Sequence, residues 1–142
     1  MMEKYCYTMY EKLKNIMNRR KLFKDLNELC KNLDVDYNIN SGGCCFVAAV
    51  LAEQFENYNI PFTVIHYGWI RCHYAIRVKD RIINRSDFSS KEIVYDKLMN
   101  SDCLYDIYEN ETWNTIYDVE DNSIVESEIK SLFKEYENRR SR

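Results

Sequence analysis

Two adjacent cysteines at the start of a predicted helix are the residues of this chain best suited to chemistry. Cys44 and Cys45 follow the segment Ser41-Gly42-Gly43, and an apolar, alanine-rich helical pattern begins directly after them. A thiol in the first turn of a helix lies at the positive end of the helix dipole. This favours the thiolate, which is the form of cysteine that attacks carbonyl carbon. The spacing therefore predicts a nucleophilic cysteine here.

A nucleophilic cysteine needs a base and a group that orients the base, and the chain has two histidines. His73 is preferred because it begins a regular strand pattern, whereas His66 lies at the end of a strand in an irregular stretch. Asn84 ends the strand that would pair with the His73 strand across a turn at Lys79-Asp80, within side-chain reach of the imidazole. Asp87 is the alternative for this third role.

The residues around Cys44 resemble the core of the transglutaminase-like and papain-like cysteine enzymes. The resemblance covers residues 40–88 and rests on Gly43-Cys44, on Ala48, and on the segment Asn59-Ile60-Pro61-Phe62-Thr63-Val64 that follows the helix. It implies a catalytic triad of Cys44 as nucleophile, His73 as base and Asn84 as the third member.

A frame shifted by one residue makes Cys45 the nucleophile and resembles the Gly-Gly-x-Cys of arylamine N-acetyltransferases. The Cys44 frame is preferred because the further motif residues of that family are missing. An oxyanion hole is also needed, and the backbone N–H at the helix start would supply one donor. An amide from Asn38 or Asn40 would supply the other.

Two other interpretations of the same residues stay open. Free cysteines are among the most buried residue types, so a Cys-Cys pair on an apolar helix is also compatible with plain core packing. A zinc site built from Cys44, Cys45, Cys72 and His73 is less favoured, because adjacent cysteines do not match the Cys-x-x-Cys spacing of zinc knuckles. We therefore expect no metal and no cofactor.

The elements that must position these residues follow from the apolar periodicity. Helices are expected at about 3–18, 21–33, 44–58 and 90–100, and a last helix is expected from a capping box at Ser123. Strands are expected at 62–67, 73–78 and 81–84, with strand character near 115–119. The pattern predicts one α+β domain over residues 1–142. A helical N-terminal part, a central helix packed on a small antiparallel sheet, and C-terminal helices would make up this papain-like or transglutaminase-like core.

Composition and charge limit the function classes. The chain has 142 residues and a net charge of −3, and residues 98–129 contain nine Asp or Glu and no Lys or Arg. Such an acidic segment disfavours nucleic acid as a partner. No apolar run approaches a membrane span, and six irregularly spaced cysteines without a signal segment predict reduced thiols in the cytoplasm. Richness in Asn, Lys, Tyr and Ile is typical of AT-rich bacterial or viral genomes.

These observations give two functional hypotheses. The first is a cysteine-dependent enzyme that attacks an amide or ester carbonyl of a protein or peptide substrate through an acyl-enzyme. Peptidase-like hydrolysis is preferred over transamidation or deamidation, because the predicted site residues are compactly spaced. The second is a non-catalytic binding or inhibitory protein on a degenerate version of the same fold. Its working surface would be the acidic, tyrosine-rich segment 102–121.

Overall fold

The fold is that of a computed structural model that describes residues 2–40, 44–67, 73–85, 93–110 and 119–141. The described elements are α1 (Met2–Tyr37), α2 (Cys44–Asn57), β1 (Thr63–Tyr67), β2 (Tyr74–Val78), β3 (Arg81–Ile83), β4 (Ile93–Asp96), α3 (Ser101–Asn110) and α4 (Val119–Arg140). This order confirms the α+β class, with helices before and after a small sheet.

The described strands form one antiparallel sheet in the order β3-β2-β1-β4. β2 and β3 are joined at Lys79-Asp80, directly after the paired residues Val78 and Arg81, which confirms the predicted hairpin. Lys79 has a φ of 56°, in the left-handed region. The chain therefore reverses within two residues, and the end of β3 lies at the same end of the sheet as the start of β2.

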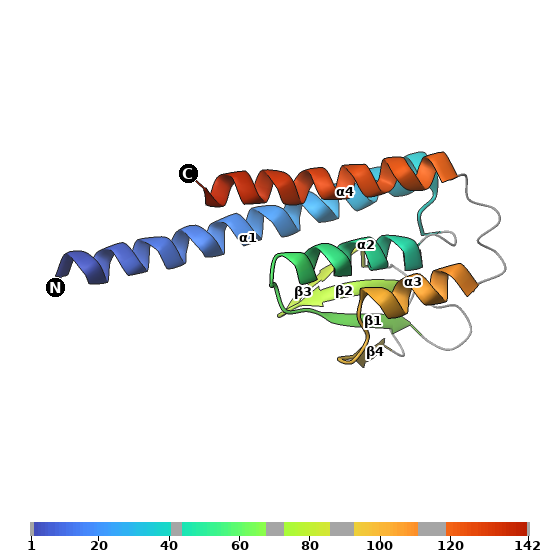
Figure 1. The fold of residues 1–142 in the computed structure, drawn as a ribbon, viewed down its shortest axis with the longest axis horizontal. Coiled ribbons are helices and arrows are strands. Elements are labelled where there is room, and N and C mark those ends of the chain that lie inside the picture. Colours follow the sequence, from blue (N-terminus) through green and yellow to red (C-terminus); the bar gives the residue numbers. More distant parts are fainter. Residues whose placement is uncertain (1, 41–43, 68–72, 86–92, 111–118, 142) are drawn as a thin grey trace.

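α2 is the buried centre of the fold. It contacts β2 on one side and both α3 and α4 on others, and it lies over the sheet in Figure 1. Its buried residues are Cys44, Cys45, Phe46, Val47, Ala48, Ala49, Val50, Leu51, Ala52, Gln54 and Phe55. Small alanines let neighbouring elements approach closely, and burial of the larger side chains supplies the hydrophobic stabilisation. The predicted central helix packed on the sheet is therefore confirmed.

The two long helices, α1 and α4, contact each other and run in opposite directions above α2 (Figure 1). Both helices bury apolar side chains in the core. Leu22, Leu26, Cys30 and Leu33 of α1 are buried, as are Ile129, Phe133 and Tyr136 of α4. The N-terminal end of α1 extends beyond the C-terminus of α4 (Figure 1). Among the described residues, no helix has the length and apolarity needed to cross a membrane.

Three sequence-based element assignments were wrong. Residues 3–18 and 21–33 belong to one helix, α1, because Arg19, Arg20 and Lys21 are all compatible with a helix interior. Of the helix expected at 90–100, residues 93–96 form strand β4 instead, and the next helix, α3, begins only at Ser101. The side-chain Oδ1 of Asn100 caps α3 by accepting a hydrogen bond from the Cys103 N–H at 3.0 Å.

The last helix is also longer than predicted, since α4 begins at Val119 and Ser123 lies inside it. Val119 is therefore helical, while the rest of the expected strand at 115–119 falls outside the described residues. Apolar periodicity does not fix where a helix begins.

Candidate active site

Cys44 is the first residue of α2, as the sequence predicts. Its side chain is buried, with 6% of the residue surface exposed. The first-turn amides of a helix have no partner within that helix, and together with the dipole they favour negative charge at this point. The position is therefore suited to a thiolate or to the oxygen anion that forms when a thiolate attacks a carbonyl.

Cys45 has a different environment from its neighbour. It is 1% exposed, and its thiol donates a hydrogen bond to the backbone oxygen of Leu104 in α3, with 3.2 Å between sulfur and oxygen. A thiolate cannot donate this bond, so the contact favours the protonated form of Cys45. Its geometry suits a packing role between α2 and α3.

His73 lies directly before β2 and is 7% exposed. Its Nε2 lies 2.6 Å from the backbone oxygen of Asn84. A carbonyl oxygen only accepts hydrogen bonds, so Nε2 carries the proton and donates it. In the neutral ring, Nδ1 is then the nitrogen that can take up a proton.

The surroundings of His73 favour the neutral ring. Burial lowers the pKa of the imidazole below its ordinary value, against smaller raising effects from the Asn84 hydrogen bond and the negative charge of Asp34. A histidine that is neutral near pH 7 is competent to accept a proton from a thiol. The site thus contains a buried base of defined tautomer.

Asn84 contacts the His73 ring, but through its backbone oxygen and not through the side chain that the sequence analysis assigned to this role. The side-chain Nδ2 of Asn84 instead donates to Oδ1 of Asn40 at 3.2 Å. The backbone N–H of Asn84 donates to Oδ1 of Asn27 at 2.9 Å. Its φ of 63° is one that Asn adopts more readily than most residues. Asn84 therefore holds the end of β3 in place at three points.

The loop before α2 is connected to this network. The backbone N–H of Asn40 donates to Oδ1 of Asp34 at 2.9 Å, and the side-chain oxygen of Asn40 accepts the bond from Asn84. Asn40 therefore connects α1 with the end of β3, and the expectation that an amide of Asn38 or Asn40 donates to an oxyanion stays a prediction. The same negative charge of Asp34 acts on His73, so these groups form one polar cluster.

The chain path brings the site elements to one end of the fold. β1 runs back beneath α2, and β2 then reverses direction, so β2 starts near the end where α2 begins (Figure 1). His73 precedes β2, Asn84 follows β3, and Cys44 begins α2. The hydrogen-bonded series Asn40, Asn84 and His73 thus includes a residue four positions before Cys44.

Two residues of this cluster, Asn27 and Asp34, were missed by sequence reasoning. Asn27 lies within the leucine-rich part of α1, and its amide both accepts from Asn84 and donates to the backbone oxygen of Ile82 at 3.2 Å. A polar side chain beside an apolar row was the one available signal for Asn27. The sequence carried no such signal for Asp34, because its hydrogen-bond partner, Asn40, was expected to help stabilise an oxyanion.

The remaining candidates divide into described and undescribed residues. His66 lies within β1, with its ring 5.8 Å from that of Tyr74, and its Nδ1 is buried without a hydrogen-bond partner among the described residues. Asp87 and Cys72 lie outside the described residues. Within the described part of the chain, no group of three or more His, Cys, Asp or Glu side chains could hold a metal ion.

Comparisons of the chain with protein-family models, with curated proteins and with solved structures find no match.

Proposed function

We propose that this protein is a cysteine-dependent acyl-transfer enzyme with a papain-like or transglutaminase-like core. Cys44 would attack an amide or ester carbonyl, and His73 would act as the base. The observation that carries the proposal is the 2.6 Å contact between His73 Nε2 and the Asn84 oxygen, because it fixes the ring tautomer at the end of the fold where α2 begins.

The proposed reaction follows from this tautomer. Nδ1 of neutral His73 takes the proton of the Cys44 thiol as the sulfur–carbon bond forms, and the carbonyl electron pair moves to oxygen. The first-turn amides of α2 stabilise that oxygen anion. The imidazolium then gives its proton to the leaving amine or alcohol, and an acyl-enzyme remains on Cys44.

Water is the proposed acceptor in the second half of the reaction. Cys44 and His73 are 6% and 7% exposed, so access to the sulfur is narrow. Narrow access favours a small acceptor over an amine carried by a second protein. His73 removes a proton from the water that attacks the thioester, the sulfur–carbon bond breaks, and the carboxylic acid leaves while the thiol is restored.

A second candidate function is supported by the surface of α3. Asp102, Asp106 and Glu109 are exposed on this helix, and Tyr105 and Tyr108 are half-buried beside them. These residues belong to the acidic, tyrosine-rich segment 102–121. In a non-catalytic binding protein it would be the working surface, and the buried Cys44 would have only a packing role.

Alkylation kinetics separate the two candidates. Iodoacetamide is reacted with the native protein near pH 7.5, and each cysteine is followed by peptide mass spectrometry. The enzyme hypothesis expects Cys44 to react faster than the other buried thiols, Cys30 and Cys45, and expects His73→Ala to slow Cys44 by at least about tenfold.

Cys103 provides an internal reference because it is exposed and lies on α3. Its alkylation should be rapid for reasons of access alone and should not respond to His73→Ala. If Cys44 reacts as slowly as Cys30, or is unaffected by His73→Ala, the catalytic proposal fails and the binding function is favoured.

A further inference from the structure

The N-terminal half of α1 carries an apolar stripe that the described part of the chain leaves exposed. The stripe consists of Met9, Tyr10, Leu13, Ile16 and Met17, which are between 46% and 67% exposed. Their spacing places them on one face of the helix. This half of α1 also extends beyond the body of the protein (Figure 1). Clustered apolar side chains on a projecting helix are typical of a protein–protein contact.

The stripe is not a continuation of the face by which α1 packs in its own fold. That inner face contains Leu22, Phe23, Leu26, Cys30 and Leu33. At about 100° per residue, the centres of the two faces lie about 130° apart around the helix. The elements that cover the inner face of α1 therefore cannot also cover the stripe by extending along the helix. A separate surface is needed to bury the stripe.

The charge around the stripe indicates what kind of surface fits it. Residues 8–24 contain six Lys or Arg and one Glu, a net charge of +5, so the rest of the chain carries −8. Two such helices packed on each other would bring basic side chains together, which is unfavourable. An acidic surface with some apolar content is the better complement.

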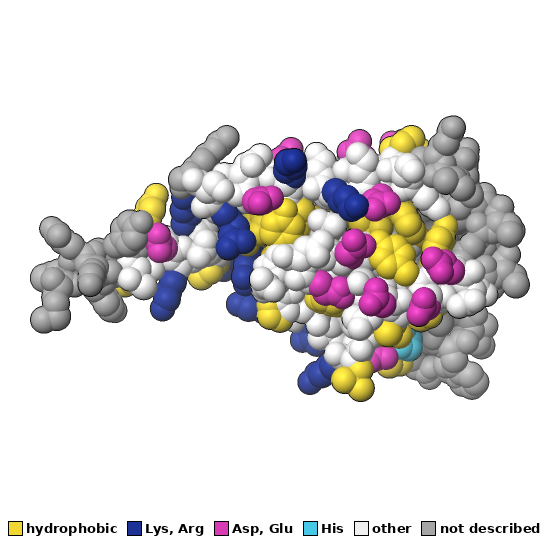
Figure 2. Space-filling model, viewed as in Figure 1, with side chains coloured by type: hydrophobic (Ala, Val, Ile, Leu, Met, Phe, Trp, Pro, Cys, Tyr) yellow, Lys and Arg dark blue, Asp and Glu magenta, His cyan; other side chains and the backbone are white. Residues whose placement is uncertain are grey.

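Such a surface is present on the body of the same protein. We define the acidic face as Glu53 and Glu56 of α2, Asp102 and Asp106 of α3, and Glu126 of α4. Figure 2 shows acidic side chains gathered over these helices around an apolar area, while Lys and Arg side chains gather toward the projecting end of α1.

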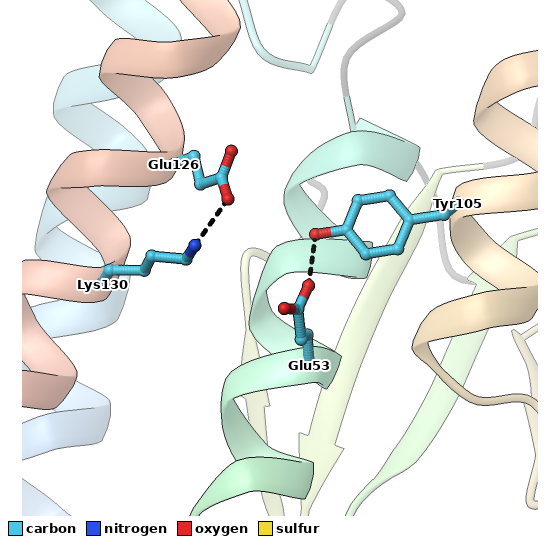
Figure 3. A network of polar contacts seen from close by, with 4 residues as sticks. All are labelled: Glu53, Tyr105, Glu126 and Lys130. Atoms are coloured by element: carbon cyan, nitrogen blue, oxygen red, sulfur yellow. Dashed lines mark hydrogen bonds and ion pairs between the residues drawn. The ribbon is translucent and has the colours of Figure 1, made fainter.

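Two carboxylates of the acidic face are held by neighbouring side chains. Tyr105 donates a hydrogen bond to Glu53 at 2.7 Å, and Glu126 pairs with Lys130 at 2.7 Å on the neighbouring helix (Figure 3). Burial, the bond to Glu53 and the charges of Glu126 and Glu56 all raise the pKa of Tyr105. Beneath these groups, the ring of Phe46 packs against the rings of Tyr105 and Tyr108. Aromatic rings beneath acidic groups combine apolar area with negative charge, which complements an apolar stripe bordered by Lys and Arg.

We propose that a second copy of this chain covers the stripe, with the basic, apolar N-terminal half of α1 lying on the acidic face of that copy. Reciprocal exchange of the two helices closes a symmetric dimer. Apolar contact supplies most of the affinity, and the opposite charges select the partner surface and speed association. An anionic lipid surface is the less favoured occupant, because the chain as a whole is negative and carries its own complement.

The first test compares matched substitutions of exposed apolar residues. Sedimentation velocity over a series of concentrations should show a reversible dimer that dissociates as the NaCl concentration is raised. Leu13→Glu with Met17→Glu should weaken the dimer by at least about tenfold. Leu98→Glu should not, although Leu98 is 91% exposed, because it lies outside both surfaces. Circular dichroism checks that each variant keeps its helices.

The second test exchanges charges between the two surfaces. Lys12→Glu with Arg20→Glu lowers the net charge of residues 8–24 from +5 to +1 and places acidic side chains at two positions of the helix. Asp102→Lys with Asp106→Lys makes part of the acidic face basic. Each double variant alone should be monomeric. A mixture of the two should associate, since each helix then meets a partner surface of opposite charge.

Several outcomes overturn the proposal. These are a monomer at every concentration, a dimer that keeps its affinity after Leu13→Glu with Met17→Glu, and a mixture of charge variants that stays monomeric. A monomer that co-sediments with phosphatidylserine vesicles, and loses this binding after Leu13→Glu with Met17→Glu, would assign the stripe to a membrane surface instead.

Discussion

Burial of the His73 ring couples its protonation to folding. The Nε2 proton is donated to the Asn84 oxygen, and burial lowers the pKa of the ring. Protonation of His73 in the folded protein therefore places a charge in a buried site, whereas the same histidine in the unfolded chain is protonated in water. Folding and the neutral form of the base thus favour each other.

This coupling predicts a pH dependence of stability. Because the folded pKa lies below the unfolded value of about 6.5, the unfolded state binds more protons as the pH falls through that value. The contribution of His73 to the unfolding free energy should be fully present above about pH 6.5 and should decline as the pH falls toward the lower folded pKa. Urea unfolding at a series of pH values measures it.

His73→Gln is the control for this measurement, because it removes the titrating group. The difference in unfolding free energy between the wild type and His73→Gln should become less favourable to the wild type on acidification. A difference that stays constant from pH 7.5 to pH 5 would contradict the assigned environment of the ring.

Residue types predicted the candidate nucleophile and base, but not how the base is held. Cysteine at a helix start and histidine at a strand start are local patterns. By contrast, Asn27 meets Asn84 and Ile82 across 57 and 55 positions of the chain. Hydrogen bonds between such distant segments depend on how helices pack against the sheet. For this reason Asn27 and Asp34 could not be found by spacing.

At the scale of elements, the two-residue turn between β2 and β3 is formed with an unfavourable residue. Lys79 has a φ of 56°, whereas Asp80 has no such positive φ, a combination typical of a type II′ turn. Glycine is the preferred residue at the first position of that turn, because a side chain makes the left-handed region costly. Lys79 is thus an unfavourable residue for the backbone conformation that this turn requires.

Lys79→Gly should therefore stabilise the protein by about 1 kcal/mol. Urea unfolding at constant pH measures the gain. Asp80→Gly is the matched control, because it adds backbone freedom at a position that does not need a positive φ and should give no gain. Equal effects of the two substitutions would contradict the assigned turn.

Apolar periodicity predicted most elements, and the failures have physical causes. Of the helix expected at 90–100, residues 93–96 instead form β4, which pairs with β1. The next helix, α3, begins only at Ser101, where Asn100 caps it and Glu56 of α2 accepts bonds from the backbone N–H and the hydroxyl of Ser101. The carboxylate of Glu56 reaches this helix start from 45 positions away in the chain. Tertiary contacts of this kind decide where a short helix begins.

At the scale of the whole molecule, one aromatic cluster connects the long helices to the central helix. The centroid of the Phe55 ring in α2 lies 5.2 Å from that of Phe133 in α4 and 6.2 Å from that of Phe23 in α1. It lies 6.1 Å from the ring centroid of Phe62, which precedes β1. Phe55 is completely buried. The layer formed by α1 and α4 therefore shares a core with the layer that carries the candidate site.

Because Phe55 connects these layers, Phe55→Ala should lower the unfolding free energy by about 3–5 kcal/mol, and Phe55→Leu should cost less because it keeps part of the buried volume. Urea unfolding followed by far-ultraviolet circular dichroism measures both. Tyr95→Ala, at an exposed ring that packs on Arg77, should cost less than about 1 kcal/mol. A small loss for Phe55→Ala, or a wild type that unfolds in two separate transitions, would mean that the helical layer and the sheet fold independently.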